Sequence, residues 1–554
     1  MRISNHSIGQ NTLSFCLALY VGGLLNLSVF YRQGMSGRPD ALVDTSLAAL
    51  AVIAVCYFLF SILALGGQWT YRLGGSFVLL FSAAASYYMT FFNVVIGYGV
   101  VVSVLTTDID LSKEAFGYKF VIWIVFAAVL PILLLLRVRL INNFYDRLKS
   151  RWRGLPALTF LLLAIGVAVL SLQHLETLKE AQVRIDNQYT ASASGIVAHS
   201  FLPTNWIAGT GLYLSQLVDD DETEKSLLNP AEKFTYTAAA PMEDTYVVFV
   251  IGETTRSDHV GLLGYQRDTT PLLGREKNLV ALKGISCDTA TKLSLRCMFV
   301  RPGGASENEQ RTLKERNVFA VLKTLGFSSE LYALQSEVWF YNSIDPDSFE
   351  IREVVAAESA NTNKPIDDML LVNELEKSVA RHPHGKHLVV LHTKGSHWLY
   401  SQRYPRTFAR YQPECLSIDA TCSKQQLVNS FDNSVLYVDY VLEQAINRLR
   451  DKNAIIFYSS DHGESIDENT HFHAAPRAMA PPEQFRVPFF VWASDRFLAT
   501  PSRAAGFAQL KALQAAGATK HQTDLFDSIL GCIGYVSPDG GINSKNNWCQ
   551  VSGH

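Results

Sequence analysis

The sequence lacks the features that mark several large protein classes. Its 554 residues contain 48 Lys and Arg against 51 Asp and Glu, a net charge of -3. Without a basic stripe or an RNA-binding signature, we expect no nucleic-acid partner. No Cys-x-x-Cys pair occurs among its eight cysteines, which argues against a zinc finger. No small-residue cleavage site follows the first apolar run, and a signal peptide would explain that run alone.

Long apolar runs are confined to the first ~175 residues, which predicts a membrane region followed by a soluble domain. Five runs are apolar enough, and near enough to ~20 residues, to cross a bilayer as helices. The third is long enough to bend or to continue past the membrane surface. We therefore expect a five-helix transmembrane bundle in residues 1–173, with spans at 12–30, 43–65, 74–104, 120–137 and 155–172.

Basic residues in the short loops predict the orientation of this bundle. The stretch after the fourth span should be cytoplasmic because it holds Arg137, Arg139, Arg147, Lys149, Arg151 and Arg153. The fifth span then leaves the cytoplasm. The N-terminus is therefore expected inside the cell, and everything after residue 173 outside the membrane.

Six of the eight cysteines lie in the soluble part as three pairs of near neighbours. Short loops close most readily, so neighbour pairing is favoured among the 15 possible connectivities. The alternative is six reduced thiols in a cytosolic domain, but paired cysteines agree with the charge bias and the odd number of spans. The expected disulfides are Cys287–Cys297, Cys415–Cys422 and Cys532–Cys549.

Residues 174–243 interleave apolar and charged side chains. This pattern is typical of an interfacial bridging helix with a linker, although an ordinary surface helix and loop would also fit. From about residue 244 onward, apolar strands alternate with helical patterns such as 370–380 and 429–448. We expect 244–554 to form an α/β domain with a mainly parallel sheet and helices on both faces.

Acids and histidines follow the expected strands where ligands of such sheets bind, beyond the carboxyl ends. Glu253 comes directly after the run 247–252, and Asp461 and His462 follow the run 455–460. Zinc binds imidazole nitrogen and carboxylate oxygen, and adjacent Asp and His can both reach one ion. A single histidine after a strand is more often a cap or a core hydrogen-bonding residue. Several acids and histidines at successive strand ends together favour a metal site.

Two more histidines and a hydroxyl-rich loop complete the expected site. His397 lies in the loop after the strand 388–392, and His473 follows the Asp461 strand. A metal-bound hydroxyl is a nucleophile at neutral pH, whereas a free Thr or Ser is not. A single Thr in a turn more commonly bonds the backbone. In the cysteine-bounded loop, the candidate nucleophiles are Thr289, Thr291 and Ser294.

Four motifs resemble those of the lipid phosphoethanolamine transferases. They are Gly252-Glu253-Thr254-Thr255-Arg256-Ser257-Asp258-His259, Ser286-Cys287…Thr291…Cys297-Met298-Phe299, Gly395-Ser396-His397 and Ser460-Asp461-His462-Gly463-Glu464-Ser465. The resemblance covers essentially the whole chain. It implies a multi-pass enzyme of the bacterial inner membrane, with a periplasmic domain of the alkaline-phosphatase/sulfatase type. It is closest to members that modify the outer Kdo sugar of lipopolysaccharide, through residues 106–114 and Asp288-Thr289-Ala290-Thr291-Lys292.

The resemblance assigns roles to individual residues. It implies that Thr291 is the nucleophile and that one zinc ion is bound by Glu253, Thr291, Asp461 and His462. The phosphoryl group, or a second zinc, would be bound by His397 and His473. A lipid-headgroup site would include Ser103, Thr107 and Glu114. The chain departs from the family at Ser103, where relatives have Asn, at Ala474, where Gly is frequent, and at Gln335-Ser336-Glu337-Val338-Trp339, where relatives place Asn-Ser and a Lys.

The implied reaction is a ping-pong transfer by a monomer in contact with membrane lipids. Thr291 attacks the phosphorus of phosphatidylethanolamine, diacylglycerol leaves, and a Kdo-lipid A hydroxyl then attacks the phosphoethanolamine-threonine. Alternatives are transfer to a lipid A phosphate, a zinc phosphodiesterase, a glycerol-phosphate transferase or an inactive membrane sensor. A sulfatase would need C/S-x-P-x-R, and Cys297-Met298-Phe299-Val300-Arg301 lacks the proline.

Overall fold

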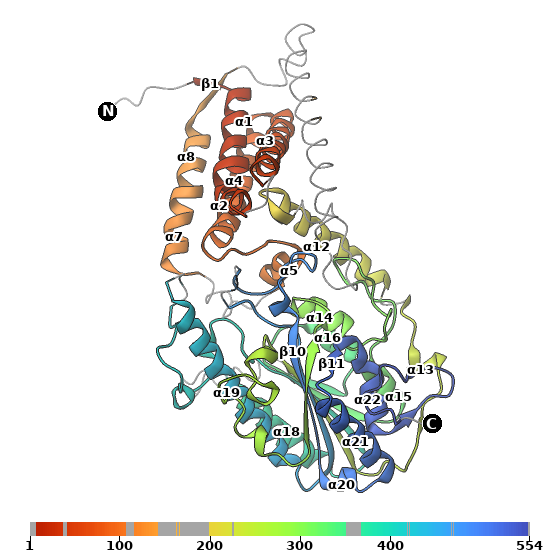
Figure 1. Ribbon diagram of the computed structural model, residues 1–554. Coiled ribbons are helices and arrows are strands. Elements are labelled where there is room, and N and C mark those ends of the chain that lie inside the picture. Colours follow the sequence, from red (N-terminus) through yellow and green to blue (C-terminus); the bar gives the residue numbers. More distant parts are fainter. Residues whose placement is uncertain are drawn as a thin grey trace. The chain divides into compact units, whose positions relative to one another are not determined.

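The chain forms two compact units, which we call the helical unit and the α/β unit (Figure 1). The helical unit comprises residues 1–101, 115–213 and 475–479, and the α/β unit comprises 102–114, 214–474 and 480–554. The computed structural model describes residues 7–36, 41–106, 116–141, 162, 166, 199–223, 226–350, 367–417, 419, 421–466, 468 and 470–551.

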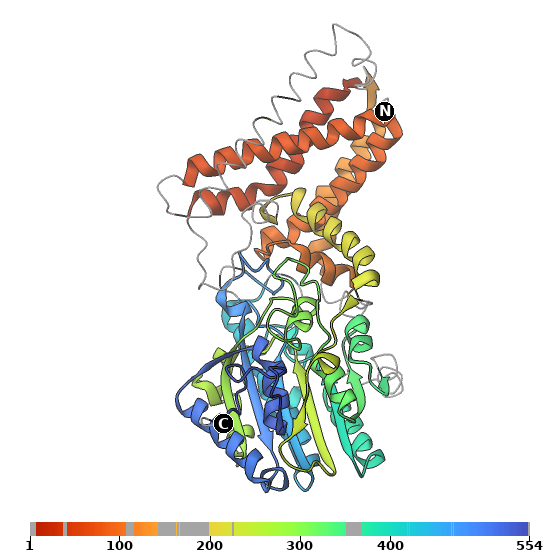
Figure 2. The ribbon, with the colours of Figure 1, turned by 90° about the vertical axis from the view of Figure 1, so that its right-hand side faces the viewer.

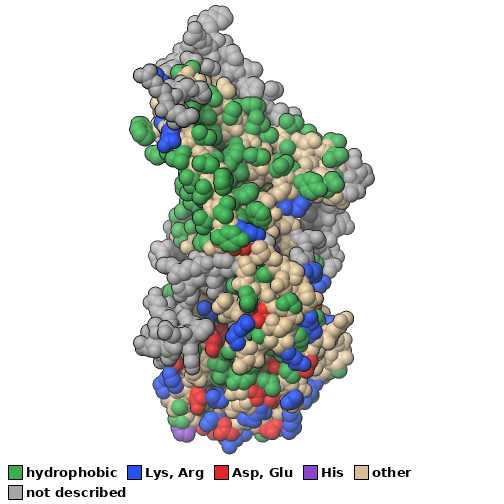
Figure 3. Space-filling view, turned by 90° about the vertical axis from the view of Figure 1, so that its left-hand side faces the viewer, with side chains coloured by type: hydrophobic (Ala, Val, Ile, Leu, Met, Phe, Trp, Pro, Cys, Tyr) green, Lys and Arg blue, Asp and Glu red, His purple; other side chains and the backbone are tan. Residues whose placement is uncertain are grey.

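Four segments of the described helical unit are long and apolar enough to cross a membrane. Their outer surfaces are hydrophobic, and Figure 3 shows such side chains gathered over these helices. Such segments suit a lipid environment for a second reason as well, because hydrogen bonds within each helix satisfy its backbone polar groups. The four segments are Gln10–Gly34, Ala41–Leu65, Gly67–Phe91 and Tyr118–Arg137. Their main helices are α1 (Gln10–Ala18), α2 (Leu27–Gly34), α3 (Ala41–Leu65), α4 (Gly67–Phe91), α7 (Tyr118–Ile124) and α8 (Leu130–Arg137).

The third span begins and ends earlier than the apolar run 74–104 predicts. Helix α4 ends at Phe91, and a separate helix, α5 (Tyr98–Thr106), follows. Between them Asn93 has a φ of 55°, which a continuing right-handed helix does not allow. The fifth expected span, 155–172, lies outside the described residues apart from 162 and 166.

A buried asparagine joins the first span to the segment that precedes α12 (Thr204–Thr223). Asn26 is fully buried, and its amide donates to the Leu202 carbonyl at 3.1 Å. Its oxygen accepts from the Leu202 N–H at 2.9 Å. The Asn26 amide also reaches the carbonyls of Val21 and Gly22, at 3.0 and 3.2 Å. One side chain therefore satisfies both backbone groups of Leu202 in an apolar interior, where unpaired groups destabilise the fold.

An eight-stranded sheet forms the centre of the α/β unit, in the order β11-β5-β10-β9-β4-β8-β6-β7. Strand β10 is antiparallel to β5 and β9, and the other neighbours are parallel. The sheet is therefore mixed but mostly parallel, as expected. Its strands are β4 (Thr245–Gly252), β5 (Leu279–Ile285), β6 (Ser328–Ala333), β7 (Ser348–Glu350), β8 (Lys386–His392), β9 (Asn453–Ser460), β10 (Arg486–Ala493) and β11 (Thr519–His521).

Helices cover both faces of this sheet (Figures 1 and 2). Because side chains alternate along a strand, Val247 and Phe249 of β4 enter one core, and Val248 and Val250 enter the other. The first core includes residues of α15 (Val318–Thr324), α16 (Val338–Ile344), α21 (Pro501–Ala515) and α22 (Leu525–Ile533). The second includes residues of α18 (Met369–Arg381) and α19 (Lys424–Leu449).

Strand register brings four carboxyl ends to one edge of the sheet. Ile251 of β4 lies opposite both His392 of β8 and Ser459 of β9. His392 also lies opposite Ala333, the last residue of β6. The residues that follow these four strands therefore start side by side.

The cysteines of the α/β unit are paired as the spacing predicts. The disulfides join Cys287 to Cys297, Cys415 to Cys422, and Cys532 to Cys549. The first closes the loop that leads into α14 (Thr291–Cys297). It therefore restrains the shape of the segment that carries the candidate nucleophiles.

Replacement of Asn26 by Leu should destabilise the helical unit. The change leaves both Leu202 backbone groups without this partner, so we expect a loss of about 1–3 kcal/mol. Thermal unfolding of the purified protein in detergent measures the loss. Ser46→Ala is the control, because its exposed hydroxyl bonds the Leu42 carbonyl of its own helix. Equal unfolding temperatures for Asn26→Leu and Ser46→Ala would contradict the bridging role.

Candidate active site

Two buried carboxylates follow neighbouring parallel strands. Glu253 comes directly after β4 and Asp461 directly after β9, where Gly252 pairs with Ser460. The Asp461 N–H donates to the Gly252 carbonyl at 3.0 Å, which extends the pairing by one residue. Both acids are almost fully buried. The sheet therefore brings two negative charges to one point.

The backbone around Glu253 leaves room for glycine alone at one position of the β8 loop. Gly395 has a φ of +48°, and a Cβ there would lie 2.6 Å from the Glu253 carbonyl oxygen. The next residue, Ser396, donates its N–H to that carbonyl at 2.9 Å. The loop that leads to His397 is thus packed directly on the backbone of Glu253.

Among the candidate nucleophiles, Thr291 hydrogen-bonds both Glu253 and His462. It begins α14 and is partly exposed. Its Oγ1 donates to Glu253 Oε2 at 3.3 Å and lies 3.2 Å from His462 Nε2. Thr289 and Ser294, the other candidates, are almost fully buried. The geometry therefore favours Thr291.

Hydrogen bonds orient His462 and His473 in the site. Nδ1 of His462 lies 2.9 Å from the Gly463 carbonyl, and Nδ1 of His473 lies 2.9 Å from Glu464 Oε2. Since carbonyl and carboxylate oxygens can only accept, both Nδ1 atoms carry hydrogen. His462 Nε2, which faces Thr291, is therefore left with a lone pair when this ring is neutral. Glu464 is a residue of this site that sequence reasoning missed, although it lies within the Asp461-His462 motif.

The third histidine, His397, joins the same group. Its ring centre lies 5.6 Å from that of His473, which in turn lies 4.4 Å from that of His462. Its Nδ1 hydrogen-bonds the Trp398 carbonyl, so the hydrogen lies on Nδ1. Burial is the main cause that lowers the pKa of His397 well below its usual value, followed by the charge of His473. His397 is thus a neutral ring with a free lone pair on Nε2.

The pKa values of the other titratable groups in the site are shifted in different directions. Burial, followed by Asp461 and Glu464, raises the pKa of Glu253 well above its usual value. Burial also raises the pKa of Asp461 and lowers that of His462. For His473, burial lowers the pKa, but the Glu464 carboxylate outweighs it and the net shift is upward. A bound cation would relieve the repulsion between the two carboxylates.

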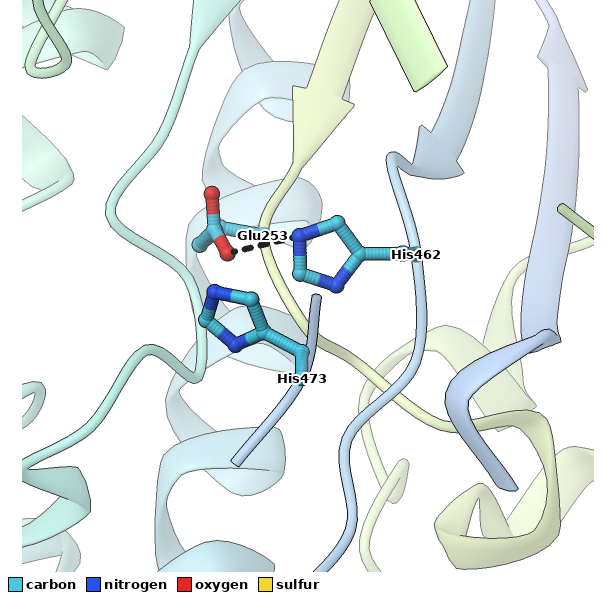
Figure 4. A group of neighbouring side chains, drawn as sticks. All are labelled: Glu253, His462 and His473. Atoms are coloured by element: carbon cyan, nitrogen blue, oxygen red, sulfur yellow. Dashed lines mark ion pairs between the residues drawn. The ribbon is translucent and has the colours of Figure 1, made fainter. Parts of the chain in front are cut away.

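The donor set fits a zinc ion. Glu253 Oε1 and Asp461 Oδ2 are buried without a hydrogen-bond partner. His462 Nε2 lies 3.6 Å from Glu253 Oε1 and 3.2 Å from Asp461 Oδ2. Donor atoms of Glu253, His462 and His473 lie within 4.8 Å of one another, and Figure 4 shows these side chains converging. Imidazole nitrogen and carboxylate oxygen are ligands that zinc prefers.

Gln335 supports this group from the end of β6. Its amide donates to Glu253 Oε2 and to the Thr393 carbonyl, both at 3.2 Å. In the segment that follows β6, the Trp339 indole donates to Glu337 Oε2 at 2.7 Å. The Arg296 guanidinium of α14 stacks over the Trp339 ring. The segment 335–339 thus contacts both the carboxylate group and the helix of Thr291.

Another group of acid and histidines lies at the opposite ends of the strands. Donor atoms of Glu330, His382 and His387 also lie within 4.8 Å of one another. Arg381 and Tyr332 donate to Glu330, and both ring nitrogens of His387 hydrogen-bond serine hydroxyls. These partners satisfy the same atoms that would bind a metal, so the cluster is an internal polar network.

Of the three expected lipid-headgroup residues, the structure describes Ser103 alone, so the expected site stays a prediction. Ser103 lies on α5. Thr107 and Glu114 lie outside the described part of the chain.

His392, which ends β8, hydrogen-bonds the Tyr341 hydroxyl through Nδ1 at 2.8 Å. Burial lowers the pKa of His392 to about 4.

Comparisons with known proteins agree with this architecture. The family described as Sulfatase matches residues 245–535, and the family described as Phosphoethanolamine transferase EptA/EptB matches residues 12–189. The Kdo(2)-lipid A phosphoethanolamine 7''-transferase of Escherichia coli is 52% identical over 98% of each chain. Phosphoethanolamine transferase EptA of Escherichia coli is 27% identical, over 95% of this chain and 94% of that protein.

A solved structure resembles both parts of the chain. It is the integral membrane protein lipooligosaccharide phosphoethanolamine transferase A (EptA) from Neisseria meningitidis, with a TM-score of 0.82 and 25% identity. The match covers 98% of this chain and 99% of that one. The chain therefore belongs to the phosphoethanolamine transferases, with an α/β unit of the sulfatase family.

Proposed function

We propose that this protein transfers phosphoethanolamine from phosphatidylethanolamine to the Kdo sugar of Kdo-lipid A. The observation that carries the proposal is the Thr291 hydroxyl, 3.3 Å from Glu253 and 3.2 Å from His462. The identity of 52% to a Kdo(2)-lipid A phosphoethanolamine 7''-transferase supports phosphoethanolamine as the transferred group and Kdo-lipid A as the acceptor.

In the first half-reaction, Thr291 Oγ1 attacks the phosphorus of phosphatidylethanolamine. The bond between that phosphorus and the diacylglycerol oxygen breaks. The Thr291 proton leaves toward Glu253 Oε2, to which the hydroxyl already donates. The diacylglycerol oxygen takes up the proton that Thr291 released, so the step neither gains nor loses a proton. The product is phosphoethanolamine esterified to Thr291. Splitting one transfer into two displacements at the same phosphorus is the advantage of a covalent nucleophile.

A zinc ion held by Glu253, Asp461, His462 and Thr291 would lower the pKa of the Thr291 hydroxyl and offset phosphoryl charge. The chain's own groups contribute in other ways. The Glu464 carboxylate raises the pKa of His473 and favours its charged form, in which Nε2–H can be donated to a phosphoryl oxygen. Charge neutralisation of this kind is the main task in phosphoryl transfer. His473 could instead join His397 in holding a second zinc, as the resemblance allows.

In the second half-reaction, a Kdo hydroxyl attacks the phosphorus and Thr291 Oγ1 leaves. His397 is suited to accept the proton of that hydroxyl, because its Nε2 carries a lone pair and its Nδ1–H is held by Trp398. Thr291 Oγ1 regains, as it departs, the proton that His397 took from the sugar hydroxyl, so His397 becomes neutral again. Balanced in this way, the site returns to its starting state with phosphoethanolamine on the sugar.

The proposed location is the bacterial inner membrane, with the N-terminus in the cytoplasm and the α/β unit in the periplasm. Three disulfides in the α/β unit support an oxidising compartment. The basic stretch that begins at Arg137 and Arg139 supports a cytoplasmic loop after the fourth span. We propose that the protein acts there as a monomer, with residues 174–243 along the membrane surface.

Replacement of Thr291 by Ala should abolish the covalent intermediate. The purified full-length protein is incubated with zinc and phosphatidylethanolamine without acceptor, and the 287–297 peptide is analysed by mass spectrometry. Wild-type protein should carry one phosphoethanolamine on Thr291, and turnover by Thr291→Ala should fall by at least about 1,000-fold. Thr289→Ala, in the same loop, should keep the adduct. Headgroup released into water without any adduct would instead indicate a hydrolase.

Replacement of Glu253 by Gln should release zinc. The amide keeps the size of the carboxylate but lacks its charge, so we expect affinity to fall by at least about 100-fold. Elemental analysis after dialysis against a weak chelator measures the occupancy. Glu330→Gln alters the other acid and histidine cluster and should leave occupancy unchanged. Full zinc occupancy in Glu253→Gln would remove Glu253 from the ligand set.

The acceptor can be tested with two lipids that differ in the Kdo sugars. Kdo-lipid A should gain one phosphoethanolamine, and fragmentation should place it on Kdo. Lipid A without Kdo should remain unmodified under the same conditions. Equal modification of both lipids, with the group on a lipid A phosphate, would favour the alternative acceptor.

A further inference from the structure

Gln522 lies between the nucleophile loop and the strand that carries the metal ligands. It begins the short helix η11 (Gln522–Asp524), which directly follows β11. Its side chain is fully buried. In sequence it is 235 residues from Cys287 and 61 residues from Asp461, so its position results from the tertiary fold.

The Gln522 carboxamide hydrogen-bonds both sides at once. Its oxygen accepts from the Cys287 N–H at 2.9 Å, at the start of the loop. Its nitrogen donates to the carbonyls of Ser460 and Asp461, at 2.7 and 2.8 Å, at the end of β9. A primary amide supplies this combination of one acceptor and two donors, whereas a carboxylate or an alkyl group cannot.

The Cys287–Cys297 disulfide does not perform the same task. Both of its cysteines belong to the nucleophile loop and its helix α14, so the bond fixes their shape relative to each other. Gln522 instead ties Cys287 to the backbone of a different segment, the one that holds Asp461. Arg311, also buried, donates to the Cys287 carbonyl and to Asp288 Oδ2. Other segments also contact the loop, since the Ala474 N–H donates to the Thr289 carbonyl at 2.7 Å. Gln522 is the side chain that links Cys287 to the backbone of Ser460 and Asp461.

We propose that Gln522 is a positioning residue for the transfer, which sets Thr291 against Glu253, Asp461 and His462. The inference rests on the proposed role of Thr291 as nucleophile. Thr291 lies four residues after Cys287, so movement of the loop entrance moves its hydroxyl. Misplacement of a reacting group by about 1 Å can slow a reaction by ~100-fold. Loss of the carboxamide should therefore affect the chemical step more than the binding of lipid.

The test measures single-turnover formation of the Thr291 adduct in full-length, zinc-replete protein with phosphatidylethanolamine in detergent micelles. Gln522→Met removes the acceptor and both donors while keeping the length of the side chain. We expect adduct formation to slow by roughly 10–100-fold, with KM for the lipid within about threefold of wild type. Gln522→Glu keeps the size and the acceptor but loses the donors, and it should also be slow. It provides the measurement if Gln522→Met does not fold.

Asn433→Leu is the matched control. Asn433 is also a fully buried carboxamide, and it accepts from the Tyr411 N–H at 2.8 Å and donates to the Tyr411 carbonyl at 3.0 Å. Its loss removes the same kind of bridge between α19 and a different loop. The folded fraction of Asn433→Leu should form the adduct at the wild-type rate. This comparison separates positioning of Thr291 from a general loss of stability.

Amide hydrogen exchange gives a readout that does not depend on activity. The peptide that contains Cys287 should exchange faster in Gln522→Met and Gln522→Glu than in wild type or Asn433→Leu. A wild-type rate of adduct formation, or unchanged protection of this peptide, in the Gln522 variants would overturn the inference. If wild-type protein forms no adduct, the proposed function fails instead, and exchange of the Cys287 peptide alone decides the role of Gln522.

Discussion

Two buried carboxylates placed side by side are the constraint on which the site depends. Glu253 and Asp461 follow the paired strands β4 and β9, and each keeps one oxygen without a hydrogen-bond partner. Burying charge in this way costs several kcal/mol unless a counter-charge is present. The raised pKa values of both groups express that cost. A bound cation would offset that cost, and the Thr291 hydroxyl lies beside Glu253.

The sheet and the nucleophile come from separate parts of the α/β unit. Parallel strands place the candidate ligands at one edge with little contribution from side chains, because register alone makes Gly252 and Ser460 neighbours. Strand register does not fix the position of Thr291, because this residue begins a short helix outside the sheet. Its placement depends on the contacts of the loop entrance at Cys287, which buried side chains from distant segments supply.

This division explains what the sequence could predict. Apolar runs ending in Glu253 and in Asp461-His462 predicted both the strands, which the structure contains, and the candidate ligands, which it brings together, because the two signals are adjacent in the chain. Near-neighbour cysteines revealed the disulfides for the same reason. Gln522 carries no local signal, since its partners are far away in sequence. The end of α4 was missed because a single left-handed residue, Asn93, interrupts a run that remains apolar.

In the proposed mechanism, His473 and His397 would act in different half-reactions because their hydrogen-bond partners differ. His473 is bonded to a carboxylate, which favours its charged form, whereas His397 is bonded to a backbone carbonyl and stays neutral. One ring is therefore suited to stabilise phosphoryl charge and the other to take a proton from an incoming hydroxyl. Their ring centres are 5.6 Å apart, a separation compatible with the proposal that both contact one phosphoryl group. The hydrogen-bond partner of each ring, a carboxylate for His473 and a backbone carbonyl for His397, thus distinguishes two chemically identical side chains.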